Sequence, residues 1–167
     1  MGTGANMAHY PPGAVVTAVD RNQCMLERAR QRAEASGVEV DLRLMDVQRL
    51  DFPDRSFDSA VATLVFCSVS DPVAGLRELG RVVKAGGHIY LIEHMRSEAP
   101  WLGRLMDGLD LVLARLTEER FARRTVENAR LAGLYVERVQ NLWWTGIVRL
   151  IVAIPGVRET TSASEGW

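Results

Sequence analysis

Apolar and polar residues alternate with two different periods along the first half of the chain. Residues 22–35 place apolar side chains every three to four positions, which predicts a helix that Gly37 would end. Residues 38–44 alternate apolar and charged side chains, the pattern of a half-buried strand. Residues 14–19 and 60–66 are apolar at nearly every position, as central strands of a parallel sheet are. The first half therefore predicts strands that alternate with a helix.

A second helix and a further strand are predicted in the middle of the chain. Asp71 is a suitable N-cap, and Pro72 fits the first helical position. The apolar periodicity of this helix continues until the glycine pair at 86–87. Residues 89–92 are apolar again, which predicts another buried strand.

The last third of the chain predicts two helices followed by a hairpin. Residues 101–116 form a long amphipathic pattern, and a shorter helix runs from Thr125 to Gly133. Two β-like segments follow at 135–142 and 147–154. Their connection is too short for a parallel crossover, so they are expected to pair antiparallel.

This order of elements predicts an α/β fold class with one domain over residues 1–154. The expected architecture is a Rossmann-like, doubly wound sheet that is mostly parallel and ends in a C-terminal antiparallel hairpin. A length of 167 residues suits a single domain. Residues 155–167 are small and polar, and a flexible tail is expected there.

Composition narrows the classes of function. An apolar fraction of 47% and a charged fraction of 25% are ordinary for a globular protein, and the net charge of −1 argues against a nucleic-acid partner. Two cysteines without C-x-x-C spacing and three histidines argue against a disulfide framework or a zinc site, so a cytoplasmic location is expected. No apolar run is long enough to cross a bilayer. Peripheral membrane contact stays open.

The first twenty residues carry the clearest chemical signal. Gly2 and Gly4 form a turn that lets the backbone approach a ligand, and Asp20 ends the next predicted strand, where a carboxylate can accept ribose hydroxyls. A dinucleotide fingerprint would need a third glycine where Met7 stands. The alternative is the looser glycine turn of S-adenosylmethionine enzymes.

Further polar residues fall where other strands are predicted to end. Asp46 follows the strand at 38–44, Cys67 and Ser68 follow the strand at 60–66, and His94 follows the strand at 89–92. The carboxyl ends of parallel strands meet at one edge of a sheet, where ligands bind. This clustering strengthens the interpretation as a cofactor site.

The ordered set of motifs resembles the class I S-adenosylmethionine-dependent methyltransferases. It is similar to the ubiquinone/menaquinone and phospholipid N-methyltransferases and to methyltransferase-like thiol methyltransferases. The resemblance covers residues 2–154. It is carried by the segments Gly-Thr-Gly-Ala-Asn at 2–6, Tyr-Pro-Pro-Gly at 10–13, Val-Asp-Arg-Asn at 19–22, Leu-Asp-Phe-Pro at 50–53, Ser-Phe-Asp at 56–58, Leu-Val-Phe-Cys-Ser-Val at 64–69, Arg-Val-Val-Lys-Ala-Gly-Gly at 81–87 and Glu-His at 93–94.

The resemblance implies S-adenosyl-L-methionine as the cofactor and a set of residues that contact it. It implies that Asp20 accepts the ribose hydroxyls and that Asp46 accepts from the adenine amino group. For Asp46 the alternative is a turn carboxylate that binds local N–H groups. The residues implied in cofactor binding are Gly2, Gly4, Asp20, Arg21, Met25, Asp46, Val47, Phe66, Cys67 and Ser68.

The resemblance also implies a small-molecule acceptor for the methyl group, such as a quinone, a phospholipid amine or a thiol. His94 is the candidate base or substrate contact, because it follows the last parallel strand. The alternative is a structural histidine held by Glu93. The two cysteines are interpreted as packing residues. Two rival functions stay open: a catalytically silent fragment or interaction subunit, and an NAD-dependent oxidoreductase.

Two elements of the resembled family are not expected in this sequence. In that family a central strand immediately precedes the glycine turn, whereas this sequence starts at Met1, so we expect the first strand and the N-terminal helix to be missing. The strands at 14–19 and 60–66 would then close on each other, borrow a strand from another chain, or leave backbone groups unpaired. We therefore expect this form to bind S-adenosylmethionine poorly and to self-associate through the gap.

Overall fold

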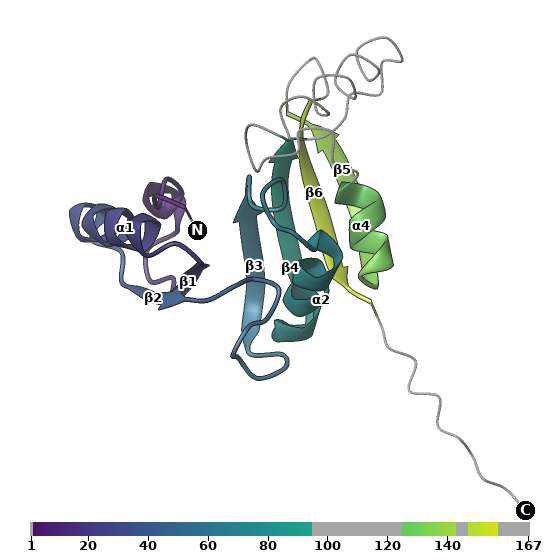
Figure 1. The fold of residues 1–167 in the computed structure, drawn as a ribbon, viewed down its shortest axis with the longest axis horizontal. Helices are drawn as coiled ribbons and strands as arrows, with labels where there is room; N and C mark the ends of the chain where they lie inside the picture. Colours follow the sequence, from purple (N-terminus) through teal and green to yellow (C-terminus); the bar gives the residue numbers. More distant parts are fainter. Residues whose placement is uncertain (1, 95–124, 143–146, 157–167) are drawn as a thin grey trace, which may run out of the picture.

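The computed structural model describes residues 2–94, 125–142 and 147–156, and the fold is given for these ranges (Figure 1). The helix predicted over 101–116 and the turn predicted at Thr145 and Gly146 lie outside them. So does the predicted tail, apart from its first two residues.

The N-terminal part of the chain forms a small parallel β-α-β unit. A 3-10 turn, η1 (Met7–His9), precedes β1 (Val16–Asp20), α1 (Gln23–Ser36) and β2 (Val40–Leu44), and β1 pairs parallel with β2. Asn22 caps α1 by accepting the N–H of Cys24 at 2.9 Å. Gly37 ends the helix with a φ of 67°, a left-handed conformation that glycine adopts without steric cost. The predicted start and stop of this helix are confirmed.

The remaining described elements build a four-stranded sheet with helices on one face (Figure 1). The strand order is β3-β4-β6-β5, in which β3 and β4 are parallel and β6 is antiparallel to both of its neighbours. The predicted C-terminal hairpin is therefore confirmed. The elements are β3 (Phe57–Thr63), α2 (Pro72–Val82), β4 (Val83–His94), α4 (Thr125–Leu131), β5 (Leu134–Asn141) and β6 (Val148–Pro155).

The main core lies between this sheet and helices α2 and α4. It is built by apolar side chains that alternate along the strands and recur every three to four residues along α2, as the pattern predicts. Leu76 on α2, Ala129 on α4, and Ile89, Leu91 and Ile151 on the strands are completely buried. A smaller cluster joins Met7 to Ala29 and Ala33 on α1.

The two sheets are not joined to each other by a strand ladder. Among the described residues, no backbone hydrogen bond connects β1 with β3, although the two strands are the facing edges of the N-terminal unit and the main sheet (Figure 1). Of the three outcomes expected for these strands, direct closure on each other is therefore excluded. The two units still touch, because Val19 packs against the main core and the Asn6 side chain donates to Thr63 Oγ1 at 2.9 Å.

Two predicted boundaries in the main sheet are wrong. β3 ends at Thr63 rather than at residue 66, because Leu64 adopts a φ of 53° and turns the chain. β4 begins at Val83, directly after α2, so the glycine pair at 86–87 lies inside a strand. Gly87 is suited to this place because a Cβ there would collide with the carbonyl oxygen of Asp58 on the neighbouring strand.

Candidate functional site

The carboxyl end of β1 brings the glycine turn and its predicted acid together. The backbone N–H of Gly2 donates to Asp20 Oδ2 at 2.7 Å, and the N–H of Asn22 donates to Asp20 Oδ1 at 2.9 Å. Each carboxylate oxygen is thus oriented by one backbone group. Gly2 and Asp20 are 18 residues apart in the sequence. The turn η1 and the turn at Gly13, whose φ is 82°, lead the chain back so that the two residues meet.

The electrostatic environment keeps Asp20 ionised. Partial burial alone would raise the pKa of this carboxyl, but the N–H groups of Asn22 and Gly2 are among the contacts that outweigh it, so that its pKa lies below its ordinary value. An ionised carboxylate held by backbone donors is a strong acceptor for hydroxyl groups. This is the chemistry that recognition of a ribose requires.

The turn favours glycine at both positions, but for different structural reasons. Gly4 has a φ of 80°, and a Cβ there would lie 3.1 Å from Ala29 Cα and 3.3 Å from Met7 Cε, so the turn packs directly on α1. Gly2 has a φ of 61°, and nothing lies within 4 Å of the position that its Cβ would take. Arg32 fixes the turn from α1 by donating to Thr3 Oγ1 at 2.7 Å. The space beside Gly2 is therefore open, while the turn at Gly4 packs against α1.

Met7 shows why the turn departs from a dinucleotide fingerprint. Its side chain is 1% exposed and packs against Ala29 and Ala33 of α1. The position that would carry the third glycine is therefore filled by a core side chain.

The other residues predicted beside Asp20 lie just before α1 and in its first turn. Arg21 is exposed and Met25 is half-buried. Cys24 is exposed on the same helix, so its interpretation as a packing residue is wrong.

The second predicted acid lies beside the first and makes a local turn. Asp46 is held next to β1 because the N–H of Met45 donates to the carbonyl of Asp20 at 3.1 Å. Asp46 Oδ1 accepts the backbone N–H of Gln48 at 2.9 Å, and the Gln48 side-chain amide donates to Oδ1 at 3.0 Å and to Oδ2 at 2.9 Å. The alternative in which Asp46 binds local N–H groups is thus observed. The contact of Asp46 with the adenine amino group stays a prediction.

Gln48 also connects this loop to the one that follows β3. Its carbonyl Oε1 accepts the hydroxyl of Ser70 at 3.0 Å and the N–H of Asp71 at 2.8 Å. The NH2 group of the Gln48 side chain thus binds Asp46, and its carbonyl oxygen binds Ser70 and Asp71. Gln48 therefore connects two loops that carry predicted site residues. Sequence reasoning missed Gln48, because nothing in the motif pattern distinguishes a glutamine at this position from a surface residue.

Most of the residues predicted to flank the methionine part of the cofactor are buried. Phe66 is 1% exposed, and it packs with Val47 against α2 at Gly75. Cys67 is 4% exposed and its Sγ lies 3.4 Å from the Leu64 carbonyl, so its packing role is confirmed. Ser68 is half-buried and donates its hydroxyl to the Val65 carbonyl at 3.0 Å. These side chains shape the loop rather than line an open surface.

Glu93 has a role that the sequence did not indicate. This side chain is completely buried at the carboxyl end of β4, and its Oε1 accepts the N–H groups of Val65 at 2.8 Å and Phe66 at 3.0 Å. It lies opposite Arg149 of β6, which is 6% exposed. The carboxylate thereby fixes the loop after β3.

His94 is the last residue of β4, where it is paired in register with Val148. The side chain of His94 lies outside the part of the chain that the structure describes. Its backbone stands at the same edge of the sheets as Asp20, Asp46 and the loop at 64–68, because all follow parallel strands. The placement agrees with the prediction, and the function of the side chain stays a prediction.

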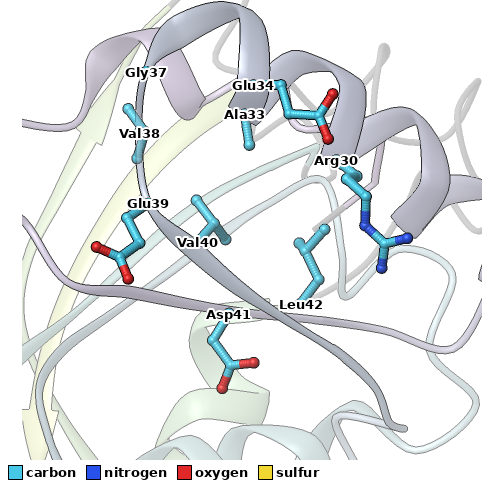
Figure 2. A pocket seen from close by; sticks show the side chains of 9 residues that line it. All are labelled: Arg30, Ala33, Glu34, Gly37, Val38, Glu39, Val40, Asp41 and Leu42. Carbon is cyan, nitrogen blue, oxygen red and sulfur yellow. The ribbon is translucent and has the colours of Figure 1, made fainter.

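A groove elsewhere on the N-terminal unit contains none of these residues. It lies between the second half of α1 and β2 and is lined by residues including Arg30, Glu34, Val40 and Leu42 (Figure 2). Its residues 37–40 lead into the amino end of β2, whereas the candidate site lies at the carboxyl ends. The groove is therefore not part of the site.

Comparison with known proteins decides the family. The methyltransferase domain family matches residues 1–91 of the chain, which include the glycine turn, Asp20, Asp46 and the loop at 64–68. The chain belongs to the class I S-adenosylmethionine-dependent methyltransferases. The cofactor of this family is S-adenosylmethionine, so the prediction of this cofactor in preference to a dinucleotide is confirmed.

Three curated methyltransferases illustrate the relationship. The chain is 37% identical over 103 residues to phosphatidylethanolamine N-methyltransferase of Cereibacter sphaeroides, covering 60% of this chain and 51% of the relative. It is 30% identical over 152 residues to human thiol S-methyltransferase TMT1A, covering 83% of this chain and 60% of the relative. It is 39% identical over 112 residues to demethylmenaquinone methyltransferase of Thermus thermophilus, covering 58% of this chain and 51% of the relative. The chain thus spans about half to three fifths of these methyltransferases.

A solved structure shows the same fold. A S-adenosylmethionine-dependent methyltransferase from Methanosarcina mazei superposes with a TM-score of 0.71 at 23% identity, covering 93% of this chain and 89% of that one. The predicted fold class is confirmed by this likeness. Within the described residues, none of the helices of this methyltransferase domain is long and apolar enough to cross a membrane.

Proposed function

We propose that this methyltransferase domain takes part in methyl transfer from S-adenosylmethionine to a small, lipophilic acceptor. The observation that carries the proposal is the arrangement at the end of β1, where Asp20 is oriented by the N–H groups of Gly2 and Asn22 and kept ionised. A carboxylate offers about four acceptor positions in fixed directions once its plane is set. The arrangement fits a cofactor that presents two ribose hydroxyls.

The other proposed contacts follow the same edge. Gly2 and Gly4 supply the backbone of the turn, and the open space at Gly2 admits a ligand close to the main chain. Arg21, just before α1, and Met25, in its first turn, would lie beside the adenine. Asp46, with Val47 behind it, would accept from the adenine amino group. Gln48 would hold the Asp46 carboxylate in place.

The loop that follows β3 would flank the methionine part. Phe66 and Cys67 contribute mainly by packing, because both are buried, while Ser68 is the half-buried member. Glu93 supports this loop by accepting hydrogen bonds from the N–H groups of Val65 and Phe66. A loop held by a buried carboxylate keeps its shape when the ligand leaves, which favours a preorganised site.

The chemistry needs little from the protein beyond positioning. The bound cofactor supplies a sulfonium methyl group that is already activated toward a nucleophile. A base is then needed only for the proton of the acceptor, and His94 is the proposed base because it ends β4 at this edge.

The proposed acceptor classes come from the relatives. They are named for phosphatidylethanolamine, thiols and demethylmenaquinone, and we propose one of these three acceptor types for this domain. All three kinds of acceptor combine a nucleophilic atom with an apolar body, so they share a requirement for positioning beside an apolar surface.

The test is a methyl-transfer assay with tritiated S-adenosylmethionine and three separate acceptors: phosphatidylethanolamine vesicles, demethylmenaquinone and a long-chain alkyl thiol. Transfer to one acceptor that is lost in Asp20→Ala and kept in Asp41→Ala would support the proposal. Asp41 is the matched control, because it is an exposed acid on the adjacent strand β2 that pairs only locally with Arg43 at 2.8 Å. Cofactor binding without transfer to any acceptor would instead favour a catalytically silent subunit.

A further inference from the structure

Strand β2 has an open edge on the side away from β1. Among the described residues, β2 pairs with β1 and with no other strand. The N–H of Met45, which follows β2, donates to the Asp20 carbonyl at 3.1 Å and so points toward β1. Backbone groups alternate sides along a strand, so the N–H and carbonyl groups of Val40, Leu42 and Leu44 point away from β1. This edge can therefore accept a further strand.

The side chains of β2 divide between the two faces of the strand. Val40 and Leu42 point toward α1, where they pack against the small cluster that includes Ala33, and they line the groove between α1 and β2 (Figure 2). Asp41 points to the opposite face (Figure 2), and strand alternation places Arg43 on that face too. Arg43 Nε lies 2.8 Å from Asp41 Oδ2, and about half of each side chain is exposed. The edge thus has one apolar and one charged face.

The sequence of β2 is complementary to itself when two copies run in opposite directions. The segment Val-Asp-Leu-Arg-Leu at 40–44 has Leu42 at its centre, an acid before it and a base after it. In an antiparallel pair of two copies centred on Leu42, Asp41 of each copy stands opposite Arg43 of the other. Val40 of each copy likewise stands opposite Leu44 of the other. Opposite charges across a strand pair stabilise it, whereas like charges destabilise it.

The backbone favours the same register. In an antiparallel pair, opposite residues either exchange both hydrogen bonds or exchange none. Leu42 directs its N–H and carbonyl to the open edge, so the Leu42 residues of two copies can exchange both bonds, and so can Val40 with Leu44. Asp41 and Arg43 direct their backbone groups to β1, so they form the second kind of pair, in which the two residues lie closer together.

Other registers fail on one of these two criteria. A shift by one residue would place a residue whose backbone points to β1 opposite one whose backbone points outward, and the hydrogen bonds would be lost. A shift by two residues would keep the hydrogen bonds, but it would place Arg43 opposite Arg43 or Asp41 opposite Asp41. The charges and the backbone together therefore select the pair that is centred on Leu42.

The groove would receive the apolar face of the second copy. Opposite residues of an antiparallel pair project to the same face of the sheet, so the Leu42 side chains of both copies would lie side by side at the groove. Leu44, which is 57% exposed, would be covered by Val40 of the other copy. Both α1 helices would lie on this face, related by a twofold axis.

We propose that β2 is an interface between two copies of this chain, in which the two β2 strands pair antiparallel about Leu42. The two-stranded sheets of the two copies then become one four-stranded sheet in the order β1-β2-β2-β1. The occupant is a second copy because β2 itself matches both the charge pattern and the direction of the backbone groups. The pairing uses no residue of the candidate site, and it does not depend on methyl transfer.

Analytical ultracentrifugation of the full chain measures the association. Five paired residues and a groove make a small interface, and small interfaces are typical of transient complexes. We expect a dissociation constant of about 10–200 µM, which requires samples from about 5 to about 500 µM.

Charge reversal tests the register. Asp41→Arg places two arginines on the edge of each copy, and Arg43→Asp places two aspartates there, so each variant alone should have a dissociation constant raised about tenfold or more. An equimolar mixture of the two variants should form a heterodimer about as tight as the unaltered dimer, because the arginines of one copy face the aspartates of the other. Recovery in the mixture also shows that both variants are folded.

A matched variant controls for the change in net charge. Asp51→Arg makes the same substitution at an exposed acid outside β2, and it should leave the dissociation constant unchanged. Amide hydrogen exchange then locates the interface. The outward amides of Leu42 and Leu44 should exchange about three to six times more slowly at the highest concentration than at the lowest, because the monomer fraction falls by this factor. The amide of Arg43, which points toward β1, should not respond.

Two results would overturn the proposal. One is a chain that stays monomeric at the highest concentration. The other is a dimer whose dissociation constant is the same in Asp41→Arg, in Arg43→Asp and in their mixture, since its interface would then lie elsewhere on the chain. Because no readout uses the cofactor or a methyl acceptor, failure here is distinct from failure of the proposed methyl transfer.

Discussion

Arg81 fastens the loop between β2 and β3 to helix α2, and its replacement by methionine is expected to destabilise the domain. The guanidinium donates five hydrogen bonds: two to Glu78 at 2.8 Å, and one each to the carbonyls of Leu50 at 2.8 Å and Phe52 at 2.7 Å and to Asp54 at 2.8 Å. The Glu78 carboxylate in turn accepts the N–H of Leu50 at 2.8 Å. This network holds the loop that begins with Asp46.

The size of the effect can be worked out from these contacts. The two carbonyl bonds contribute about 1 kcal/mol each, and the paired bonds to Glu78 about 1.5–3 kcal/mol. The bond to Asp54 contributes little, because that side chain is 71% exposed. The Arg81 side chain is itself 26% exposed, so water replaces part of what is lost. We expect Arg81→Met to lower the free energy of unfolding by about 2–4 kcal/mol, which lowers Tm by about 5–15 °C.

The pH dependence of this effect provides a second check. The hydrogen bonds from Arg81 are the largest cause that holds the pKa of Glu78 below its ordinary value of 4.5. The contribution of a carboxyl with a lowered folded-state pKa is complete above the ordinary value and is lost as the pH falls through the folded-state pKa. The stability difference between the unaltered chain and Arg81→Met should therefore narrow as the pH falls below about 4.5.

Thermal and urea unfolding at pH 7 and pH 3.5 measure both effects. Arg77→Met is the control, because Arg77 is exposed on the same helix, and we expect a change below about 0.5 kcal/mol. Equal stability of the two variants at pH 7, or a difference that is the same at both pH values, would refute the network as described.

Three other predictions follow from the described contacts. Gly4→Ala should cost about 2–4 kcal/mol, because it combines a left-handed φ with a close approach to Ala29, whereas Gly2→Ala should cost about 1–2 kcal/mol for its φ alone; equal losses in thermal melts would contradict this. Native-state alkylation should modify exposed Cys24 at least tenfold faster than buried Cys67, as measured by mass spectrometry of the digested chain, and equal rates would show that the loop after β3 is open. If His94 is the base, His94→Ala should lower turnover with little change in cofactor affinity, and unchanged turnover would make His94 structural.

Much of the fold could be predicted because local signals and burial agree. Helix α1 was predictable from its apolar period and from Gly37, and α2 from Asp71 and Pro72. The C-terminal hairpin followed from the short connection between two apolar runs. In these elements propensity, capping and patterning all specify the same structure.

The errors occur where tertiary contacts override the local pattern. Residues 64–66 are apolar and read as strand, but the buried Glu93 carboxylate binds the N–H groups of Val65 and Phe66 and holds them in a turn. Gly87 reads as a loop residue, yet it lies in β4, where its lack of a side chain permits a close approach of Asp58. Neither contact could be deduced from sequence, because each joins residues about 27 to 29 positions apart.

The candidate site was predicted in position more than in detail. The pairing of the glycine turn with Asp20 could be predicted, because a strand end and a turn at this spacing form a known type of ligand site. The hydrogen bonds of Gln48 could not be predicted, because its partners Ser70 and Asp71 come close to it only in the folded chain. The exposure of Cys24 also could not be deduced, because helical periodicity alone does not say which flank of an apolar stripe is covered.

The most direct test of the account is the affinity of this domain for S-adenosylhomocysteine, measured by calorimetry or ligand-observed NMR up to millimolar ligand. The account predicts that Asp20→Ala weakens binding by about 1.5–3 kcal/mol, the range for the loss of a charged hydrogen-bonding partner, which is about 10- to 160-fold in affinity. The Asp41→Ala control should bind as the unaltered chain does, because Asp41 pairs only locally with Arg43. Equal affinity of Asp20→Ala and the unaltered chain would contradict the assignment of the cofactor to the end of β1.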